Sequence, residues 1–150
     1  MSAGRRTSSG SVAPSAGEVN GVSIAAVVVG AVIGSIVRWT LDSWIDDDSA
    51  IGPALLVANT IGAFILGVTF GLGADDGRRR LAVGVGLCGG LTSFSAWSVM
   101  IAEAFEGGHT ADGTALILAH LVAGFSAFIA ARAVTRRARR ILVGEVGHLG

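Results

Sequence analysis

Four apolar stretches follow one another along this chain, and each is long enough to cross a bilayer. They cover about residues 22–45, 51–72, 81–105 and 114–134, and a helix of about 20 residues spans the hydrocarbon core. Hydrophobic residues make up 51% of the chain and charged residues only 15%. We therefore expect an all-α membrane protein with four transmembrane helices. Four such helices enclose little space, so an oligomer is also expected.

The segments outside these stretches have a different composition. Residues 1–21 are rich in Ser, Gly and Ala without an apolar period, which is typical of a disordered N-terminal tail. Residues 136–150 begin with arginines and are expected to form a basic cytoplasmic tail, which leaves residues 22–135 as one transmembrane domain. The first stretch has no convincing small-residue cleavage site before Arg38, and three more stretches follow, which favours a retained span over a secretory signal.

The arginines predict the orientation in the membrane. Every basic residue of the chain is an arginine, and with four spans all of them except Arg38 belong to the two tails or to the middle loop, on one side. Basic residues accumulate on the cytoplasmic side, so we expect both termini to be cytoplasmic and the chain to insert in a single orientation. Membrane topology and anionic lipid explain the basic tails, so we expect no nucleic-acid partner.

The first stretch carries small residues, a charge and two indole rings. Gly30 and Gly34 lie four residues apart, a spacing that favours close helix contact. Arg38 is either an anchor at the membrane boundary or the lining of a watery cavity. Trp39 and Trp44 suit the interfacial belt. The acidic residues that follow are expected to form a loop: Asp42, Asp46, Asp47 and Asp48.

The second and fourth stretches each contain one strongly polar side chain. Asn59 must form hydrogen bonds, either as an interhelical contact or with its NH2 donors directed at an anion pathway. His120 is the only imidazole at membrane depth, and we interpret it as a packed, neutral, hydrogen-bonded histidine. Ser126 is a further polar candidate for the interior. Cys88 is the only cysteine, so an internal disulfide is excluded and a packing role is predicted.

The third stretch is interrupted by residues that disfavour a helix. Glycines stand at positions 84, 86, 89 and 90, and Thr92, Ser93 and Ser95 follow them. Each glycine weakens a helix interior by about 1 kcal/mol relative to alanine. A break at membrane depth is tolerated only where protein buries it or water reaches it. The segment from Val85 to Trp97 is therefore a candidate site, within a third helix broken near its middle.

Several classes of function lack support in these residues. An enzyme is not indicated, because no nucleophile and base pair, metal cluster or phosphate loop occurs. A small drug/proton antiporter needs a membrane-buried carboxylate, yet the cores of the first two spans have none and Glu103 lies near the end of the third. A non-conducting accessory membrane subunit would explain the glycines as packing residues, but not their combination with Asn59 and the polar run after Gly90.

Three motifs in order along the chain resemble the Fluc (CrcB) family of fluoride channels. The segment Gly89–Trp97, GGLTSFSAW, is similar to the family's Gly-Gly-x-Thr-Thr-Phe-Ser-Thr-Phe signature at the break in its third helix. Residues 30–39 resemble the first-helix Gly-x-x-x-Gly-x-x-x-Arg-Tyr pattern. Residues 57–64 resemble the second-helix Val-Asn-x-x-Gly-x-Phe pattern. The resemblance covers residues 22 to about 135.

The resemblance implies a fluoride-selective channel of the prokaryotic cell (inner) membrane that lowers cytoplasmic fluoride by passive efflux. Family members are antiparallel dimers with a central structural sodium ion (Na+), held by carbonyls at the positions of Gly89 and Thr92. The glycines would let two chains approach closely enough to share this ion. The anion pathway implied for this chain comprises Phe94, Trp97, Asn59, Ser93, Arg38 and His120.

The sequence departs from the family pattern at three positions. Trp97 replaces a phenylalanine, Met100 stands where many members carry Glu, and His120 where Ser or Thr is expected. We therefore expect the two pores of a symmetric dimer to conduct unequally through these positions. Because the arginines fix one orientation whereas the family's dimer is antiparallel, the hypothesis that follows is a heterodimer with an oppositely oriented homologue.

Overall fold

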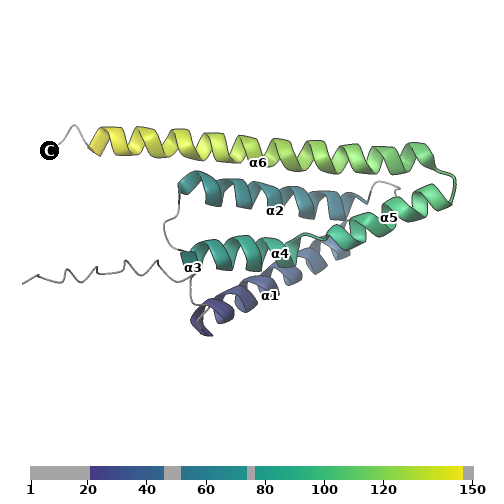
Figure 1. Ribbon diagram of the computed structural model, residues 1–150, viewed down its shortest axis with the longest axis horizontal. Helices are drawn as coiled ribbons and strands as arrows, with labels where there is room; N and C mark the ends of the chain where they lie inside the picture. Colours follow the sequence, from purple (N-terminus) through teal and green to yellow (C-terminus); the bar gives the residue numbers. More distant parts are fainter. Residues whose placement is uncertain (1–20, 46–51, 74–76, 147–150) are drawn as a thin grey trace, which may run out of the picture.

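All regular elements among the described residues are helices. The computed structural model describes residues 21–45, 52–73 and 77–146, and four of its helical segments are long and apolar enough to span a membrane (Figure 1). Three are continuous: α1 (Gly21–Trp44), α2 (Pro53–Leu72) and α6 (Thr110–Val146). The predicted all-α protein with four membrane-spanning helices is therefore confirmed. The predicted disordered tail lies outside the described residues, apart from Gly21 at the start of α1.

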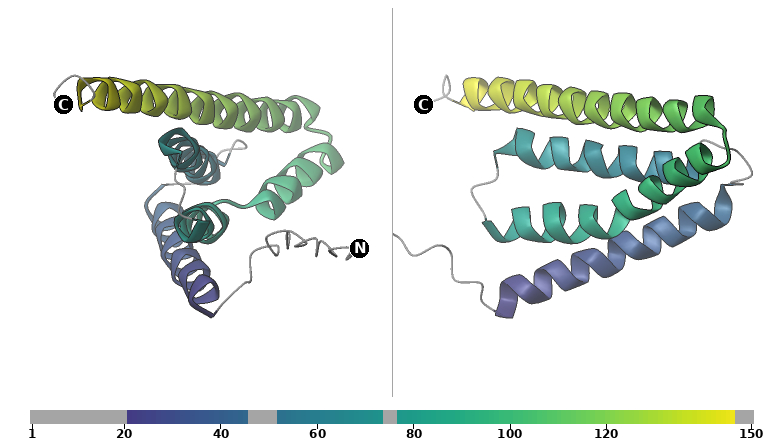
Figure 2. Two further views of the ribbon diagram at one scale, coloured as in Figure 1. Left: turned by 60° about the vertical axis from the view of Figure 1, so that its left-hand side comes forward. Right: turned by 45° about the vertical axis from the view of Figure 1, so that its right-hand side comes forward.

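The third span is built from four short helical segments. These are α3 (Gly77–Arg80), the π-helix η1 (Leu81–Leu87), α4 (Cys88–Leu91) and α5 (Phe94–Glu106). Between α4 and α5 the backbone is extended at Thr92 (φ −89°, ψ 155°) and Ser93 (φ −141°, ψ 110°). The ribbon bends at this link (Figures 1 and 2). A bend in the third span is thus confirmed, and only Thr92 and Ser93 leave the helical conformation.

The spans pack as two pairs. Helix α2 packs chiefly against α6, and α1 packs chiefly against η1 and α4; both pairs are visible in Figure 2. Glycines permit the α2–α6 contact, because a Cβ at Gly67 would overlap the Phe128 carbonyl oxygen and one at Gly71 would lie 2.7 Å from Cβ of Thr135. Small residues commonly bring membrane helices together in this way.

The pairing of α1 with the third span depends on glycines from both sides. A Cβ at Gly30 would overlap the Ala82 carbonyl oxygen, and one at Gly86 would lie 2.6 Å from the Val27 carbonyl oxygen. The same relation joins Gly34 to Leu87 and Gly90 to Ala31. The close contact predicted for Gly30 and Gly34 is confirmed.

The glycines of the third span differ in what surrounds them. Gly86 and Gly90 lie in helical backbone and admit α1 of the same chain. A Cβ at Gly89, by contrast, would meet no atom within 4 Å. Near the break, the backbone therefore opens away from its own chain at Gly89 and not at Gly86 or Gly90.

Few large side chains are buried within the single chain. Leu91 and Leu116 are the largest fully buried ones among the described residues. Cys88 is buried and its Sγ lies 3.4 Å from the Gly62 carbonyl oxygen, which confirms its packing role. Many apolar side chains on α1, α5 and α6 are exposed instead. Such surfaces suit acyl chains or another protein chain in the membrane.

Two expected boundaries differ from the structure. Asp42 lies within α1, one turn after Arg38, and not in an acidic loop; Asp46, Asp47 and Asp48 lie outside the described residues. Helix α6 continues to Val146, well beyond the expected end at Val134. The continuation has a physical basis, since residues 135–143 contain no glycine or proline and include four arginines, one alanine and one leucine, which favour helix.

Candidate functional site

The broken backbone of the third span is bonded to α2 by Asn59. The Ser93 N–H donates to Asn59 Oδ1 at 3.0 Å. A polar backbone group released by a break must find a partner at membrane depth, and the amide oxygen supplies it. The interhelical contact foreseen for Asn59 is thus present through its oxygen. Its NH2 donors are not used by this bond and can serve another acceptor.

Two diverted hydrogen bonds release carbonyls at the break. In a continuous α-helix the Ser93 N–H would bond to the Gly89 carbonyl, and the Ala96 N–H to the Thr92 carbonyl. Here the Ser93 N–H bonds to Asn59 instead. Ser93 is the N-cap of α5, and its Oγ accepts from the Ala96 N–H at 3.1 Å. The Thr92 N–H keeps its helical bond to the Cys88 carbonyl at 2.9 Å. The carbonyls of Gly89 and Thr92 therefore lose their regular helical donors.

These carbonyls suit a hard cation. Oxygen ligands bind such ions, and carbonyls of broken membrane helices coordinate sodium in transporters. The described residues contain no group of three or more His, Cys, Asp or Glu side chains that could hold a metal. Gly89 is exposed on an open side of the chain. The donor set, backbone carbonyl oxygens beside an open side of the chain, therefore fits a hard cation such as sodium.

A series of three rings begins directly after the break. The centroids of Phe94 and Trp97 are 5.4 Å apart with an interplanar angle of 56°, and those of Trp97 and His120 are 5.9 Å apart at 43°. The rings come from α5 and α6, and Phe94 is 75% exposed. Tilted rings present edges, which carry the positive part of the quadrupole. The ring series therefore offers weakly positive edges without a formal charge.

The carbonyl of Leu116 anchors two of these rings. Trp97 Nε1 donates to it at 3.4 Å, and His120 Nδ1 lies 3.0 Å from it. Because a carbonyl can only accept, His120 Nδ1 carries a proton. Its Nε2 is buried and has no hydrogen-bond partner among the described residues. The prediction of a packed, hydrogen-bonded histidine is confirmed. Leu116 was missed, because a backbone carbonyl leaves no signal in the sequence.

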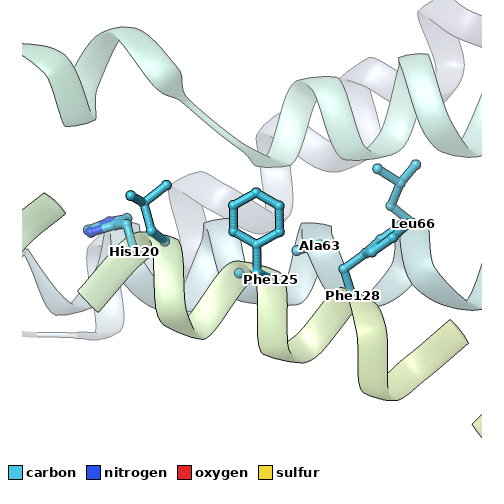
Figure 3. Close-up of a pocket in the computed structure, with 7 residues that line it drawn as sticks. Ala63, Leu66, His120, Phe125 and Phe128 are labelled. Atoms are coloured by element: carbon cyan, nitrogen blue, oxygen red, sulfur yellow. The ribbon is translucent and has the colours of Figure 1, made fainter. Parts of the chain in front are cut away.

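An apolar hollow lies beside the ring series. It has a volume of about 350 Å³ and runs between α2 and α6, with His120 near one end and the rings of Phe125 and Phe128 further along (Figure 3). Ala63 and Leu66 form its α2 side. The apolar residues of this hollow were not singled out in the sequence, since apolar side chains on a membrane helix usually face lipid.

Arg38 stands apart from the other predicted site residues. Its Nε lies 3.6 Å from Asp42 Oδ2, one turn later in α1. The structure brings together Asn59, Ser93, Phe94, Trp97 and His120, with Gly89 and Thr92 in the same broken segment. The described contacts do not join Arg38 to them, and the nearby carboxylate offsets part of its charge.

Four membrane-spanning helices, with a polar and aromatic site at a break in the third, define a small polytopic membrane protein of the broken-helix class. The chain belongs to the CrcB family, because residues 25–132 match the family described as "CrcB-like protein, Camphor Resistance (CrcB)".

Named relatives in bacteria support this membership. The chain is 39% identical over 92 residues to "Fluoride-specific ion channel FluC 2" of Synechococcus sp. (strain CC9902), covering 61% of this chain and 63% of that protein. It is 37% identical over 105 residues to "Fluoride-specific ion channel FluC" of Marinobacter nauticus, covering 67% and 83%. It is 34% identical over 104 residues to the protein of that name in Chromobacterium violaceum, covering 66% and 82%.

Proposed function

We propose that this protein is a fluoride-specific ion channel, not an enzyme, that lowers cytoplasmic fluoride by passive efflux. Its relatives in the CrcB family carry the name of fluoride-specific ion channels. The observation that carries the proposal is the junction of α4 and α5, where Asn59 binds the broken backbone and the ring series starts. Nothing in the described residues favours the antiporter or the accessory subunit over this function.

The anion would pass along Phe94, Trp97, Asn59 and Ser93. Ring edges and neutral N–H or O–H donors replace part of the hydration of a small anion. Binding must remain weak enough for the ion to leave, and uncharged donors meet that condition. His120, through the chain of rings, extends this path toward α6. Arg38 would attract anions to a vestibule by its residual charge.

The sodium ion would be structural. The carbonyls of Gly89 and Thr92 lack their regular helical donors, and a cation between two chains would satisfy them. Four such carbonyls, two from each chain, would then stabilise a dimer across the open side at Gly89. Because the arginines favour a single orientation with cytoplasmic termini in the prokaryotic cell membrane, the partner in an antiparallel dimer would be an oppositely oriented homologue.

An efflux assay tests the proposed function. Proteoliposomes containing the channel and its dimer partner are loaded with fluoride or chloride, and release is followed with ion-selective electrodes. We expect fluoride release well above chloride release. Phe94→Ile should abolish it, because the substitution removes the aromatic edge and keeps an apolar side chain.

Phe105→Ile is the matched control, since it makes the same change on the same helix outside the ring series. Equal leakage of the two halides, or unchanged fluoride flux in Phe94→Ile, would refute the assignment. Loss of flux in both variants would indicate general damage to α5 and would equally remove support for the ring series as the anion path.

A further inference from the structure

A second cavity, lined largely by arginines, lies far from the ring series, where α2 ends against α6. Its volume is about 210 Å³. Three residues at the end of α2 form one side, and three guanidinium groups of α6 form the other. The lining residues are Phe70, Gly71, Gly73, Arg136, Arg139 and Arg140.

The glycine at the end of α2 leaves space for the Arg139 side chain. Gly73 has a φ of +60°, a left-handed conformation, and a Cβ added there would lie 2.6 Å from Arg139 Nη1. The guanidinium group therefore extends across the C-terminus of α2, where the helix dipole favours a cation. Gly73, the C-cap of α2, thus leaves space for the arginine side chains that line the α6 side of the cavity.

The positive charge in this region is not balanced within the described part of the chain. The described ion pairs are those of Arg38 with Asp42 and of His109 with Asp112, and neither involves Arg136, Arg139 or Arg140. Nε of Arg132 is buried and lacks a hydrogen-bond partner among the described residues. A further guanidinium, that of Arg80, lies 4.9 Å from the centroid of the Phe70 ring. Such a concentration of guanidinium groups favours an anion with several oxygen acceptors.

The cavity lies where the apolar span of α2 ends, the level at which a lipid headgroup layer would begin. Gly71 is level with Arg132, since a Cβ at Gly71 would lie 3.0 Å from the Arg132 carbonyl oxygen. At 1.5 Å per residue, Arg136 lies about 6 Å beyond the level of Gly71. The headgroup layer of one leaflet is about 5 to 8 Å thick. In Figure 1, α6 continues past α2 in this direction.

Apolar side chains lie beside the cavity at the end of α2. Phe70, which lines it, and Leu72 are both exposed. They offer contact to acyl chains, which a free phosphate ion would not use. Charge, depth and adjoining apolar surface together point to one kind of ligand.

We propose that this cavity binds the phosphate group of an anionic phospholipid, with Arg136, Arg139 and Arg140 as its donors. Guanidinium groups bind phosphate oxygens in pairs. A lipid held there would bridge the end of α2 to the cytoplasmic extension of α6. The site is separate from the anion path, so the proposal does not depend on fluoride conduction.

Native mass spectrometry of the full-length channel tests the proposal. The detergent-solubilised protein is titrated with phosphatidylglycerol, with phosphatidylcholine, and with phosphatidylglycerol in competition with inorganic phosphate. We expect retention of phosphatidylglycerol in preference to phosphatidylcholine. Arg139→Gln should weaken retention about tenfold, the effect of losing a charge-assisted hydrogen bond. Arg140→Gln gives an independent variant should Arg139→Gln fail to assemble.

Arg137→Gln is the matched control, because it removes the same charge from the same helix at an exposed position outside the cavity lining. It should retain the lipid like the unaltered protein. Equal weakening in Arg137→Gln, or unchanged retention in both cavity variants, would overturn the proposal. Displacement of the lipid by an equal concentration of inorganic phosphate would also overturn it, by identifying a soluble anion as the ligand.

Discussion

Asn59 and Ser93 each accept a hydrogen bond from a backbone N–H at the break, and Ser93 Oγ also lies 3.2 Å from Ser95 Oγ. Asn59 accepts from the Ser93 N–H, and Ser93 accepts from the Ala96 N–H. Each bond takes the place of a helical bond whose acceptor would be a carbonyl at the break. Two short polar side chains thus stabilise the interruption and leave the carbonyls of Gly89 and Thr92 available.

Replacing Asn59 should damage both stability and conduction. Asn59→Ala leaves the Ser93 N–H without its acceptor, a loss of about 1 kcal/mol for this part-buried hydrogen bond. We expect a lower unfolding temperature in detergent and loss of fluoride efflux. Thr60→Ala, a neighbouring polar deletion on α2 that leaves this bond intact, should preserve both. Normal stability and flux in Asn59→Ala would contradict the proposed role.

The elements are held together mainly by glycine contacts. Gly30 and Gly34 of α1 face Gly86 and Gly90 of the third span, and Gly67 and Gly71 of α2 admit α6. Backbones approach closely there, so contact and alignment depend on the absence of a Cβ. This arrangement explains why so many large apolar side chains remain on the outside.

Adding one methyl group at Gly90 tests the contact between α1 and α4. In Gly90→Ala the new Cβ would overlap the Ala31 carbonyl oxygen, and relief requires the helices to separate. We expect a loss of about 1–3 kcal/mol from overpacking, measured as a lower unfolding temperature. Gly124→Ala meets no atom within 4 Å and should be neutral or stabilising. A Gly90→Ala variant as stable as Gly124→Ala would contradict the packing observed here.

The whole molecule divides into a membrane bundle and a basic extension. Its break, its ring series and its apolar hollow lie on surfaces that a second chain could complete, whereas the arginines gather at the other end of α2 and α6. Two predictions concern the whole molecule, one about the proposed sodium ion and one about the proposed dimer partner.

Removal of sodium should weaken the dimer. When sodium is replaced by N-methyl-D-glucamine, the Gly89 and Thr92 carbonyls lose their proposed cation, and we expect the dimer fraction in detergent to fall. Gly89→Val should lower it even in sodium, while the single chain keeps its helical content because no atom lies within 4 Å of the added Cβ. A dimer fraction independent of sodium would rule out the structural ion.

Expression alone and with an oppositely oriented homologue tests the heterodimer. The arginine distribution favours one orientation, so the chain by itself should give little fluoride efflux in proteoliposomes. Co-expression with the homologue should restore it. Strong efflux from the chain alone would show that it inserts both ways or functions in another arrangement, and the heterodimer would then be abandoned.

The sequence by itself determined the four spans, the interruption of the third and the residues near it. The length of each apolar stretch and the run of glycine, threonine and serine are local properties of the sequence. Because a bilayer constrains backbone structure strongly, these local properties predict it directly. The sequence did not indicate that the helix of the fourth span continues to Val146, because arginines that mark the end of a span also favour helix.

Only the tertiary structure decided which groups meet. The bond from Ser93 to Asn59 joins residues 34 positions apart, and the Leu116 carbonyl that anchors Trp97 and His120 has no signal in its side chain. The sequence also could not show which glycines pack against α1, since Gly89 and Gly90 are the same residue type. Their backbones point in different directions, one toward α1 and one away from it, and packing alone sets that difference.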